Sequence, residues 1–205
     1  MVRKTKEEAQ ETRTAILDAA EIVFKERGVS RTSLAEIATA AGVTRGAVYW
    51  HFKNKADLFD AMIQRVFGMM EDKLAELQGD ADLNPVDLLV ELALHFVDRV
   101  ANDQRYYHLL EISWHKCEYV GEMARSRDRH LECGNRYLSL SEETFRIAQA
   151  RGCLSASIDP RQAAVGLMAV VDGLVVNWTL DRSLFPLADY GPAIIRTYLA
   201  GLRAA

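Results

Sequence analysis

The sequence has few cysteines, and their arrangement does not suggest a disulfide framework or a zinc site. Its 205 residues include three, Cys117, Cys133 and Cys153, and none forms a CxxC pair. An odd number of cysteines without a pair is typical of free thiols in a reducing compartment. The pattern therefore argues against a secreted, disulfide-stabilised protein.

Neither a secretion signal nor a membrane-spanning run stands out. Residues 1–13 are rich in charge and contain no apolar stretch, so they do not resemble a signal peptide. The longest apolar run, residues 163–171, is broken by Asp172 and is too short to cross a bilayer. We therefore expect a cytoplasmic protein with no membrane partner.

Proline and strand-forming patterns are also scarce. The chain has four prolines, and no run of alternating β-branched residues stands out. Hydrophobic residues make up 49% of the sequence and charged residues 26%, which suits a soluble chain of one or two small domains. Apolar residues recur at helical spacing instead, which predicts an all-α fold.

The motifs of common enzymes are missing. There is no Ser/His/Asp order, no glycine-rich phosphate loop and no HExxH segment. Glu111, His115 and Glu118 share one predicted helix face with Cys117 nearby, so a transition-metal site is one interpretation. A network of structural ion pairs is the interpretation that we favour, because the second Cys/His pair of a usual site is missing. We expect no enzyme activity, no cofactor and no metal.

The most informative stretch is residues 33–52, where two short helices are predicted on either side of a turn. Ser33 and Glu36 have the spacing of a capping box, which satisfies free N–H groups at a helix start. Gly42 suits a tight turn because glycine tolerates positive φ, and Thr44 can cap the second helix. The pattern predicts a helix-turn-helix, whose second helix can enter a DNA major groove.

This second helix, residues 45–51, has an outward face suited to DNA. Arg45 has the guanidinium fork that pairs with a guanine edge, and the two small residues after it allow a close approach to the bases. Donors on Thr44, Tyr49 and His51 can reach phosphates. The plainer alternative is a helical corner whose polar side chains contact only solvent.

The net charge of −4 is unevenly distributed. Residues 1–55 hold ten Lys/Arg and seven Asp/Glu, a balance of +3, whereas residues 56–205 have a balance of −7. The basic surplus accompanies the helix-turn-helix, as attraction to phosphates requires. Arg3, Lys4 and Lys6 form a basic tail, which either reaches phosphates or a minor groove or is a solvated terminus.

Helical spacing continues through the rest of the chain. A first helix should end at Gly28, and the later helices are predicted over residues 54–79, 85–101, 106–114, 119–151, 160–180 and 188–203. The helix over residues 160–180 is apolar on nearly every side, so it must be buried on several sides, and a partner subunit could cover one of them. We expect the last two helices to form a dimer interface, with Trp178 and Tyr198 as anchors.

These motifs resemble the TetR family of bacterial repressors. The matching segments are residues 32–38, 41–43 and 46–55. Residues 43–50 are most similar to the acriflavine-resistance subgroup, which represses multidrug efflux pumps. Residues 115–123 and 172–178 also resemble that subgroup. The resemblance implies an N-terminal helix-turn-helix domain over residues 1–55 and a C-terminal ligand-binding and dimerisation domain over residues 56–205.

The resemblance also implies two sets of site residues. The predicted DNA-contacting residues are Thr32, Ser33, Thr44, Arg45, Gly46, Ala47, Tyr49, Trp50, His51 and Lys55. The predicted walls of an apolar ligand cavity are Phe67, Met70, Leu89, Leu92, Phe96, Leu110, Trp114, Tyr137, Met168, Val171 and Asp172. For most of the second set, packing in the core is an equally good interpretation. Asp172 needs a partner, either an internal arginine or a polar or cationic ligand group.

The function implied is that of a homodimeric repressor of double-stranded operator DNA, released by a small apolar or amphipathic inducer. Control of a multidrug efflux operon is the leading hypothesis, and control of a catabolic or other metabolic operon is the alternative. A helical small-molecule binding protein with a vestigial DNA-binding head is the alternative from another class.

Overall fold

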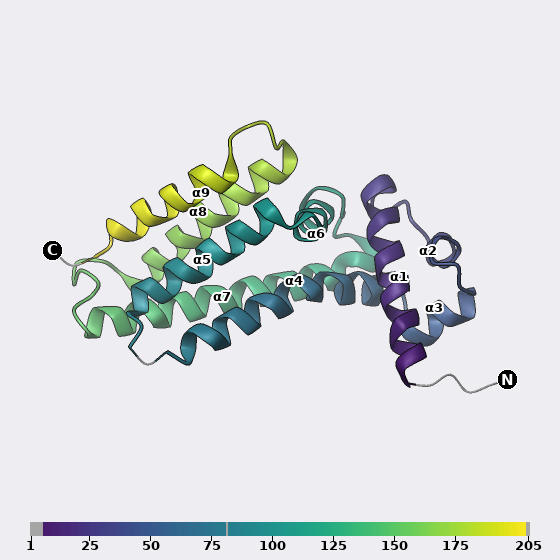
Figure 1. The fold of residues 1–205 in the computed structure, drawn as a ribbon, viewed down its shortest axis with the longest axis horizontal. Helices are drawn as coiled ribbons and strands as arrows, with labels where there is room; N and C mark the ends of the chain where they lie inside the picture. Colours follow the sequence, from purple (N-terminus) through teal and green to yellow (C-terminus); the bar gives the residue numbers. More distant parts are fainter. Residues whose placement is uncertain (1–5, 81, 204–205) are drawn as a thin grey trace. The chain divides into compact units, whose positions relative to one another are not determined.

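The computed structural model describes residues 6–80 and 82–203, except for the side chain of Phe67. Within these residues the regular elements are helices, apart from an isolated bridge between Leu154 and Arg203. They are α1 (Lys6–Arg27), α2 (Leu34–Ala40), α3 (Arg45–His51), α4 (Lys55–Gln78), α5 (Pro85–Asn102), α6 (Gln104–His115), η1 (Gly121–Met123), α7 (Ala124–Ala150), α8 (Pro160–Leu180) and α9 (Leu187–Ala200) (Figure 1). The predicted all-α fold is confirmed.

The contacts group the helices into two compact units. The first joins the described residues up to Val66 with His108–His130, and the second joins Phe67–Tyr107 with the described residues from Leu131 onward. The division passes through α4, α6 and α7. Each unit combines two separate segments of the chain, so this division does not test a single domain boundary. The predicted boundary after residue 55 therefore stays a prediction.

In the first unit, α1 lies on the short helices α2 and α3. Ile16 and Phe24 of α1 are fully buried, as are Ile37 of α2 and Val48 of α3. The buried apolar side chains of α1 therefore form the core of a three-helix unit. α1 ends where Gly28 adopts a φ of +80°, which a residue with a side chain rarely adopts.

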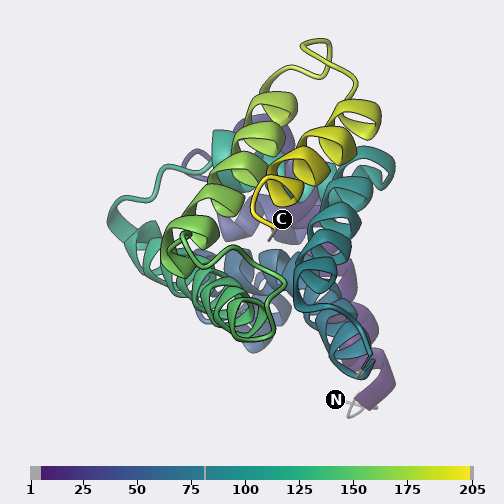
Figure 2. The ribbon, with the colours of Figure 1, turned by 90° about the vertical axis from the view of Figure 1, so that its left-hand side faces the viewer.

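In the second unit, α9 lies beside both α5 and α8 (Figure 2). Two glycines permit these close approaches. A Cβ atom at Gly191 of α9 would come within 2.7 Å of Val97 Cγ1 on α5, and one at Gly166 of α8 would come within 2.1 Å of the Tyr198 hydroxyl on α9. Small residues at these positions therefore set how closely the helices pack.

Helix α8 begins as the sequence predicts. Asp159 is its N-cap and accepts a hydrogen bond from the Gln162 N–H at 2.8 Å, and Pro160 occupies its first position. By length and composition alone α8 is apolar enough to cross a membrane, and part of it is buried in the second unit. A core helix of a globular protein satisfies the same criterion, and α8 contacts α5 and α9.

Two expectations about these helices were wrong. Residues 119–151 do not form one helix, because Gly121 takes a φ of +55° and the α-helix begins only at Ala124, after the short helix η1. Trp178 is not an exposed anchor: it is 5% exposed, and its ring meets Tyr107 edge to face. Tyr198 is also engaged within the unit, since its hydroxyl donates to the Ala163 carbonyl at 2.8 Å.

Candidate nucleic-acid interface

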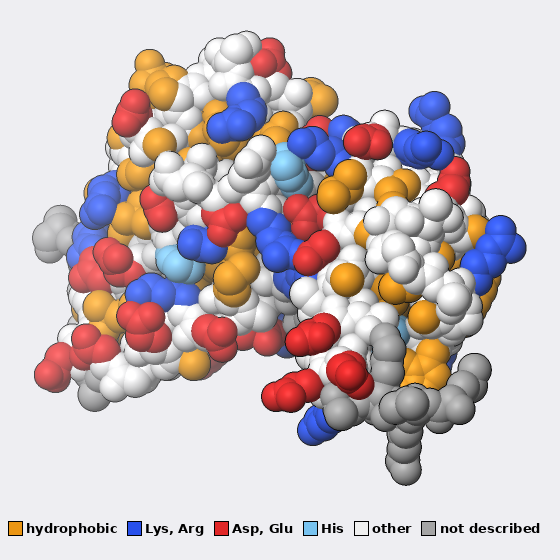
Figure 3. Space-filling view, turned by 45° about the vertical axis from the view of Figure 1, so that its right-hand side comes forward, with side chains coloured by type: hydrophobic (Ala, Val, Ile, Leu, Met, Phe, Trp, Pro, Cys, Tyr) orange, Lys and Arg blue, Asp and Glu red, His pale blue; other side chains and the backbone are white. Residues whose placement is uncertain are grey.

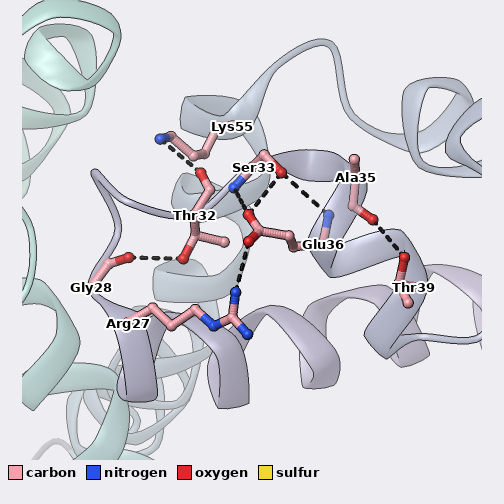
Figure 4. Close-up of polar contacts among 8 residues, drawn as sticks. All are labelled: Arg27, Gly28, Thr32, Ser33, Ala35, Glu36, Thr39 and Lys55. Atoms are coloured by element: carbon pink, nitrogen blue, oxygen red, sulfur yellow. Dashed lines mark hydrogen bonds and ion pairs between the residues drawn. The ribbon is translucent and has the colours of Figure 1, made fainter.

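The start of α2 is fixed by the predicted capping box. The Glu36 N–H donates to Ser33 Oγ at 3.3 Å, and the Ser33 N–H donates to Glu36 Oε2 at 2.8 Å. Arg27 holds the other carboxylate oxygen of Glu36 at 2.7 Å (Figure 4). The hydrogen bonds from Ser33, and to a smaller extent the charge of Arg27, hold the pKa of Glu36 below its usual value. The capping box therefore favours the ionised form of the Glu36 carboxylate.

The turn and the start of α3 also follow the sequence. Gly42 takes a φ of +65°, and Thr44 Oγ1 accepts a hydrogen bond from the Ala47 N–H at 3.2 Å. Val48 and Phe52 are buried. The Arg13 guanidinium lies 5.2 Å from the centre of the Phe52 ring, so α1 supports the end of α3 through a cation–π contact. These contacts hold α3 by its inner face.

The outer face of α3 is accessible. Arg45 and Gly46 are exposed together with the N-cap Thr44, while Ala47 and His51 are partly buried. Tyr49 is 59% exposed and Trp50 73% exposed, so both rings are accessible to a binding partner. The Trp50 and His51 rings pack edge to face, with their centroids 4.5 Å apart. The helix therefore presents a guanidinium, a phenol and an indole on one accessible surface.

On the side of the molecule drawn in Figure 3, the basic side chains of the described residues do not form a large continuous surface of one sign, because acidic side chains are interspersed among them. Several basic groups near the helix-turn-helix are already paired, for example Arg27 with Glu36 and Arg65 with Asp18. The net charge of a segment therefore overstates the number of cations that can reach a phosphate.

Thr32 is a correction to the predicted DNA-contacting set. Its side chain is buried, at 3% exposure, and its hydroxyl donates to the Gly28 carbonyl at 2.8 Å (Figure 4). The hydroxyl thus closes the turn between α1 and α2, which leaves it without a donor for a phosphate. Ser33 is exposed, but its hydroxyl is engaged by Glu36 in the capping box.

Lys55 also lies differently from the expectation. Its ammonium donates to the carbonyls of Val29, Ser30 and Thr32 at 2.9, 3.3 and 3.0 Å. Its backbone N–H, one of the free donors at the start of α4, donates to Glu122 Oε1 at 3.0 Å. The phosphate contact predicted for Lys55 is at odds with this arrangement, because both of its donor groups are occupied within the unit.

Sequence reasoning missed the residues that hold Lys55 and the turn after α1. The Lys116 carbonyl accepts from the Val29 N–H at 2.9 Å, and the Lys116 ammonium donates to the Lys25 carbonyl at 2.7 Å. Lys116 also pairs with Glu111 at 2.8 Å, which agrees with a structural role for that carboxylate rather than a metal-binding one. These partners are far apart in the chain, so no local pattern signals them.

The predicted ligand-binding residues divide between the units. Met70 and Leu92 lie in one buried cluster of the second unit, and Phe96 and Tyr137 pack against it. Leu89, three residues before Leu92 on α5, is also buried. Leu110 is buried and Trp114 partly buried in the first unit. The Phe67 side chain, like the basic residues Arg3 and Lys4, lies outside the described structure.

The predicted ligand-binding set includes two polar groups, the Tyr137 hydroxyl and the Asp172 carboxylate. The Tyr137 hydroxyl is buried and has no hydrogen-bond partner among the described residues, and burial raises the pKa of Tyr137 to about 12. On α8, Met168 and Asp172 are exposed and Val171 is partly buried. Asp172 is accessible, yet the surrounding protein desolvates its carboxylate and raises its pKa. Both polar groups suit hydrogen bonding with a ligand.

Comparisons with known proteins agree along the whole chain. The family model described as "Bacterial regulatory proteins, tetR family" matches residues 16–62, and the one described as "MAATS-type transcriptional repressor, C-terminal region" matches residues 84–204. The transcriptional regulator AcrR of Shigella flexneri is 40% identical over 209 residues, covering 97% of this chain and 94% of that protein.

Solved structures of similar chains point the same way. NalD, the secondary repressor of the MexAB-OprM multidrug efflux pump in Pseudomonas aeruginosa, aligns with a TM-score of 0.87 at 37% identity and covers 97% of this chain and 98% of its own. SmeT, an efflux-pump repressor of Stenotrophomonas maltophilia, was solved in complex with triclosan. That complex aligns with a TM-score of 0.85 at 32% identity and covers 94% of this chain and 92% of its own.

Proposed function

Because the chain belongs to the TetR family of bacterial regulatory proteins, we propose that it represses a multidrug efflux operon from operator DNA and is released by a small molecule. It acts in the cytoplasm as a homodimer, and it is a regulator rather than an enzyme. The observation that carries the proposal is the accessible face of α3, where Arg45, Tyr49 and Trp50 lie on a helix whose inner face is buried.

The DNA-binding step uses this face twice. Two identical subunits place their α3 helices in successive major grooves of a near-palindromic operator, with half-sites about 34–36 Å apart. Arg45 reads a base edge, and hydroxyl and ring N–H donors around it hold phosphates. Binding of the two heads is therefore sensitive to the distance between them, which is the property that an inducer changes.

The ligand step is supported by the polar groups of the second unit. Apolar side chains of Met70, Leu92 and Phe96 suit a greasy ligand of variable shape. The unpartnered Tyr137 hydroxyl and the desolvated Asp172 carboxylate can bind its polar groups. A ligand that binds better to the form with separated heads shifts the population away from the operator-bound form.

The dimer is supported by the outer faces of α8 and α9. Val165 of α8 is 43% exposed, and Tyr190 and Ile194 of α9 are 54% and 41% exposed. Apolar side chains at these exposures on neighbouring helices are typical of a surface that a second copy covers. These residues replace Trp178 and Tyr198 as the proposed contacts.

The proposal is tested by recovering fragments of the organism's own genome that the purified protein retains, and by measuring their affinities at a fixed salt concentration. The expected fragments contain a near-palindrome upstream of efflux-pump genes, with an affinity roughly 10³–10⁷-fold above that for unrelated DNA. Fragments from catabolic operons would instead support the metabolic alternative. Equal affinity for every sequence would show that the head does not read DNA.

A further inference from the structure

The structure assigns Lys55 a positioning role, because its ammonium donates hydrogen bonds to the turn that leads into the helix-turn-helix. We call Lys55 Nζ and the carbonyls of Val29, Ser30 and Thr32 the Lys55 clasp. Residues 116–122 contact both Lys55 and that turn. The inference rests on the proposed function for its DNA-binding readout. Its stability readout is independent of that function.

The hydrogen-bonding capacity of the ammonium supports a clasp rather than a phosphate contact. A lysine ammonium has three N–H donors and no acceptor. The three carbonyls lie 2.9 to 3.3 Å from Nζ, so each donor has a partner. A phosphate oxygen could replace one carbonyl only if that carbonyl lost its partner, which costs the stabilisation of a charge-assisted hydrogen bond.

The position of these carbonyls explains what the clasp does. They belong to the segment between the end of α1 and the N-cap of α2, and Thr32 in the same segment donates to the Gly28 carbonyl at 2.8 Å. Lys55 is the first residue of α4. The clasp therefore ties the start of α4 to the entry of α2, which fixes where the helix-turn-helix begins.

Residues 116–122 contact both sides of the clasp. Glu122 Oε1 accepts from the Lys55 N–H at 3.0 Å, and the Lys116 carbonyl accepts from the Val29 N–H at 2.9 Å. Lys116 Nζ also donates to the Lys25 carbonyl near the end of α1, at 2.7 Å. A displacement of residues 116–122 would therefore strain the turn after α1 and the first residue of α4 together.

The first test compares two lysines that lie two residues apart. Lys55→Met removes the clasp, and Lys53→Met removes the same charge from an exposed side chain that has no hydrogen bond or ion pair among the described residues. Lys55→Met should lower the melting temperature and weaken operator binding on the order of tenfold, the scale of one charged hydrogen bond. Lys53→Met should leave the melting temperature unchanged. Binding is measured well below the melting temperature of each variant.

The salt dependence separates a clasp from a phosphate contact. Each lost phosphate contact lowers the slope of log affinity against log salt by about 0.9, or about 1.8 for a dimer. Lys55→Met should keep the wild-type slope while losing affinity at every salt concentration. A reduced slope for Lys55→Met at an unchanged melting temperature would overturn the inference, because Lys55 would then contact a phosphate. Full operator affinity of Lys55→Met would also overturn it, because the clasp would then have no effect on the helix-turn-helix.

Glu122 provides a second test if Lys55→Met does not fold. Glu122→Ala removes the acceptor of the Lys55 N–H and should weaken operator binding, whereas Glu122→Gln keeps an acceptor oxygen and should restore it. Glu118→Ala removes a neighbouring exposed carboxylate and should have no effect. Equal binding by Glu122→Ala and wild type would overturn the role of residues 116–122. If the wild type shows no operator preference, the proposed function fails, and the order of melting temperatures still tests the clasp.

Discussion

At the residue scale, the important distinction is between basic groups that are free to reach DNA and those that are occupied within the fold. Arg45 is exposed at the start of α3. Lys55, only ten positions further along, donates to three carbonyls of its own unit. Sequence alone could identify both as basic residues of a DNA-binding motif, but it could not show which of them already had partners.

Arg45→Ala should weaken operator binding by about 1–3 kcal/mol and relax the preference for one base pair, because a bidentate contact with a base edge is lost. Anisotropy titrations against the operator and a set of single-base variants measure both effects. Lys53→Ala is the matched control, since it removes a charge near the same motif without a base contact. Uniform weakening on all sequences by Arg45→Ala would show that Arg45 contacts only phosphate.

Tyr137→Phe tests the proposed polar contact of the ligand site. Removing a buried hydroxyl that has no hydrogen-bond partner among the described residues should leave the ligand-free protein as stable as the wild type or slightly more so. The probe is triclosan, the compound in the solved complex of the similar SmeT, and the same change should weaken its binding by about 0.5–1.5 kcal/mol, the net contribution of one hydrogen bond. Calorimetric titration and urea unfolding give the two values. Unchanged triclosan affinity would remove Tyr137 from the polar contacts of the site.

At the element scale, local rules determine the helix starts and the turn of the head. The capping box at Ser33, the positive φ of Gly42 and the N-cap at Thr44 were predicted from the sequence and are observed. The start of α7 was mispredicted because Gly121 takes a positive φ in a stretch that otherwise has helical spacing. A glycine is compatible with both conformations, so only the surrounding contacts decide between them.

Gly191→Ala should destabilise the second unit by about 1–3 kcal/mol, the usual cost of overpacking. The added Cβ would lie 2.7 Å from Val97 Cγ1, and Val97 is fully buried on α5 with little rotamer freedom. Urea unfolding provides the measurement. Gly134→Ala on α7 is the control, because nothing lies within 4 Å of its added Cβ and helix propensity should make it neutral or stabilising.

Adding Val97→Ala to Gly191→Ala should recover part of the loss, since it removes the methyl group that clashes. A Gly191→Ala variant with wild-type stability would mean that α5 and α9 can separate without cost. The packing of these two helices would then not be what holds the second unit together.

At the scale of the whole molecule, contacts unite segments that are distant in the sequence. His108–His130 group with the N-terminal helices, although the family resemblance assigned them to the C-terminal domain. Hydrophobic patterns predicted the helices, whose apolar residues such as Ile16, Phe24 and Val48 are buried. They could not predict against which element each helix face packs, because that depends on three-dimensional arrangement.

Ile194→Asp should convert the proposed dimer to monomers at micromolar concentration, because it places an unpaired carboxylate in the apolar contact between α9 helices. Ile147→Asp on α7 is a closely matched control, since Ile147 and Ile194 are both 41% exposed. Sedimentation velocity measures the masses. A wild-type monomer that still binds the complete operator would exclude the dimer.

Ligand and operator should weaken each other's binding if the protein is an inducible repressor, and a calorimetric cycle tests this coupling directly. Triclosan is titrated into the protein alone and into the protein saturated with its selected operator at the same salt concentration. Because coupling between two sites is reciprocal, operator should weaken triclosan binding by the factor by which triclosan weakens operator binding, roughly 5–150-fold. Measurable triclosan binding with equal affinity in the two titrations would show that the ligand does not release the protein from its operator.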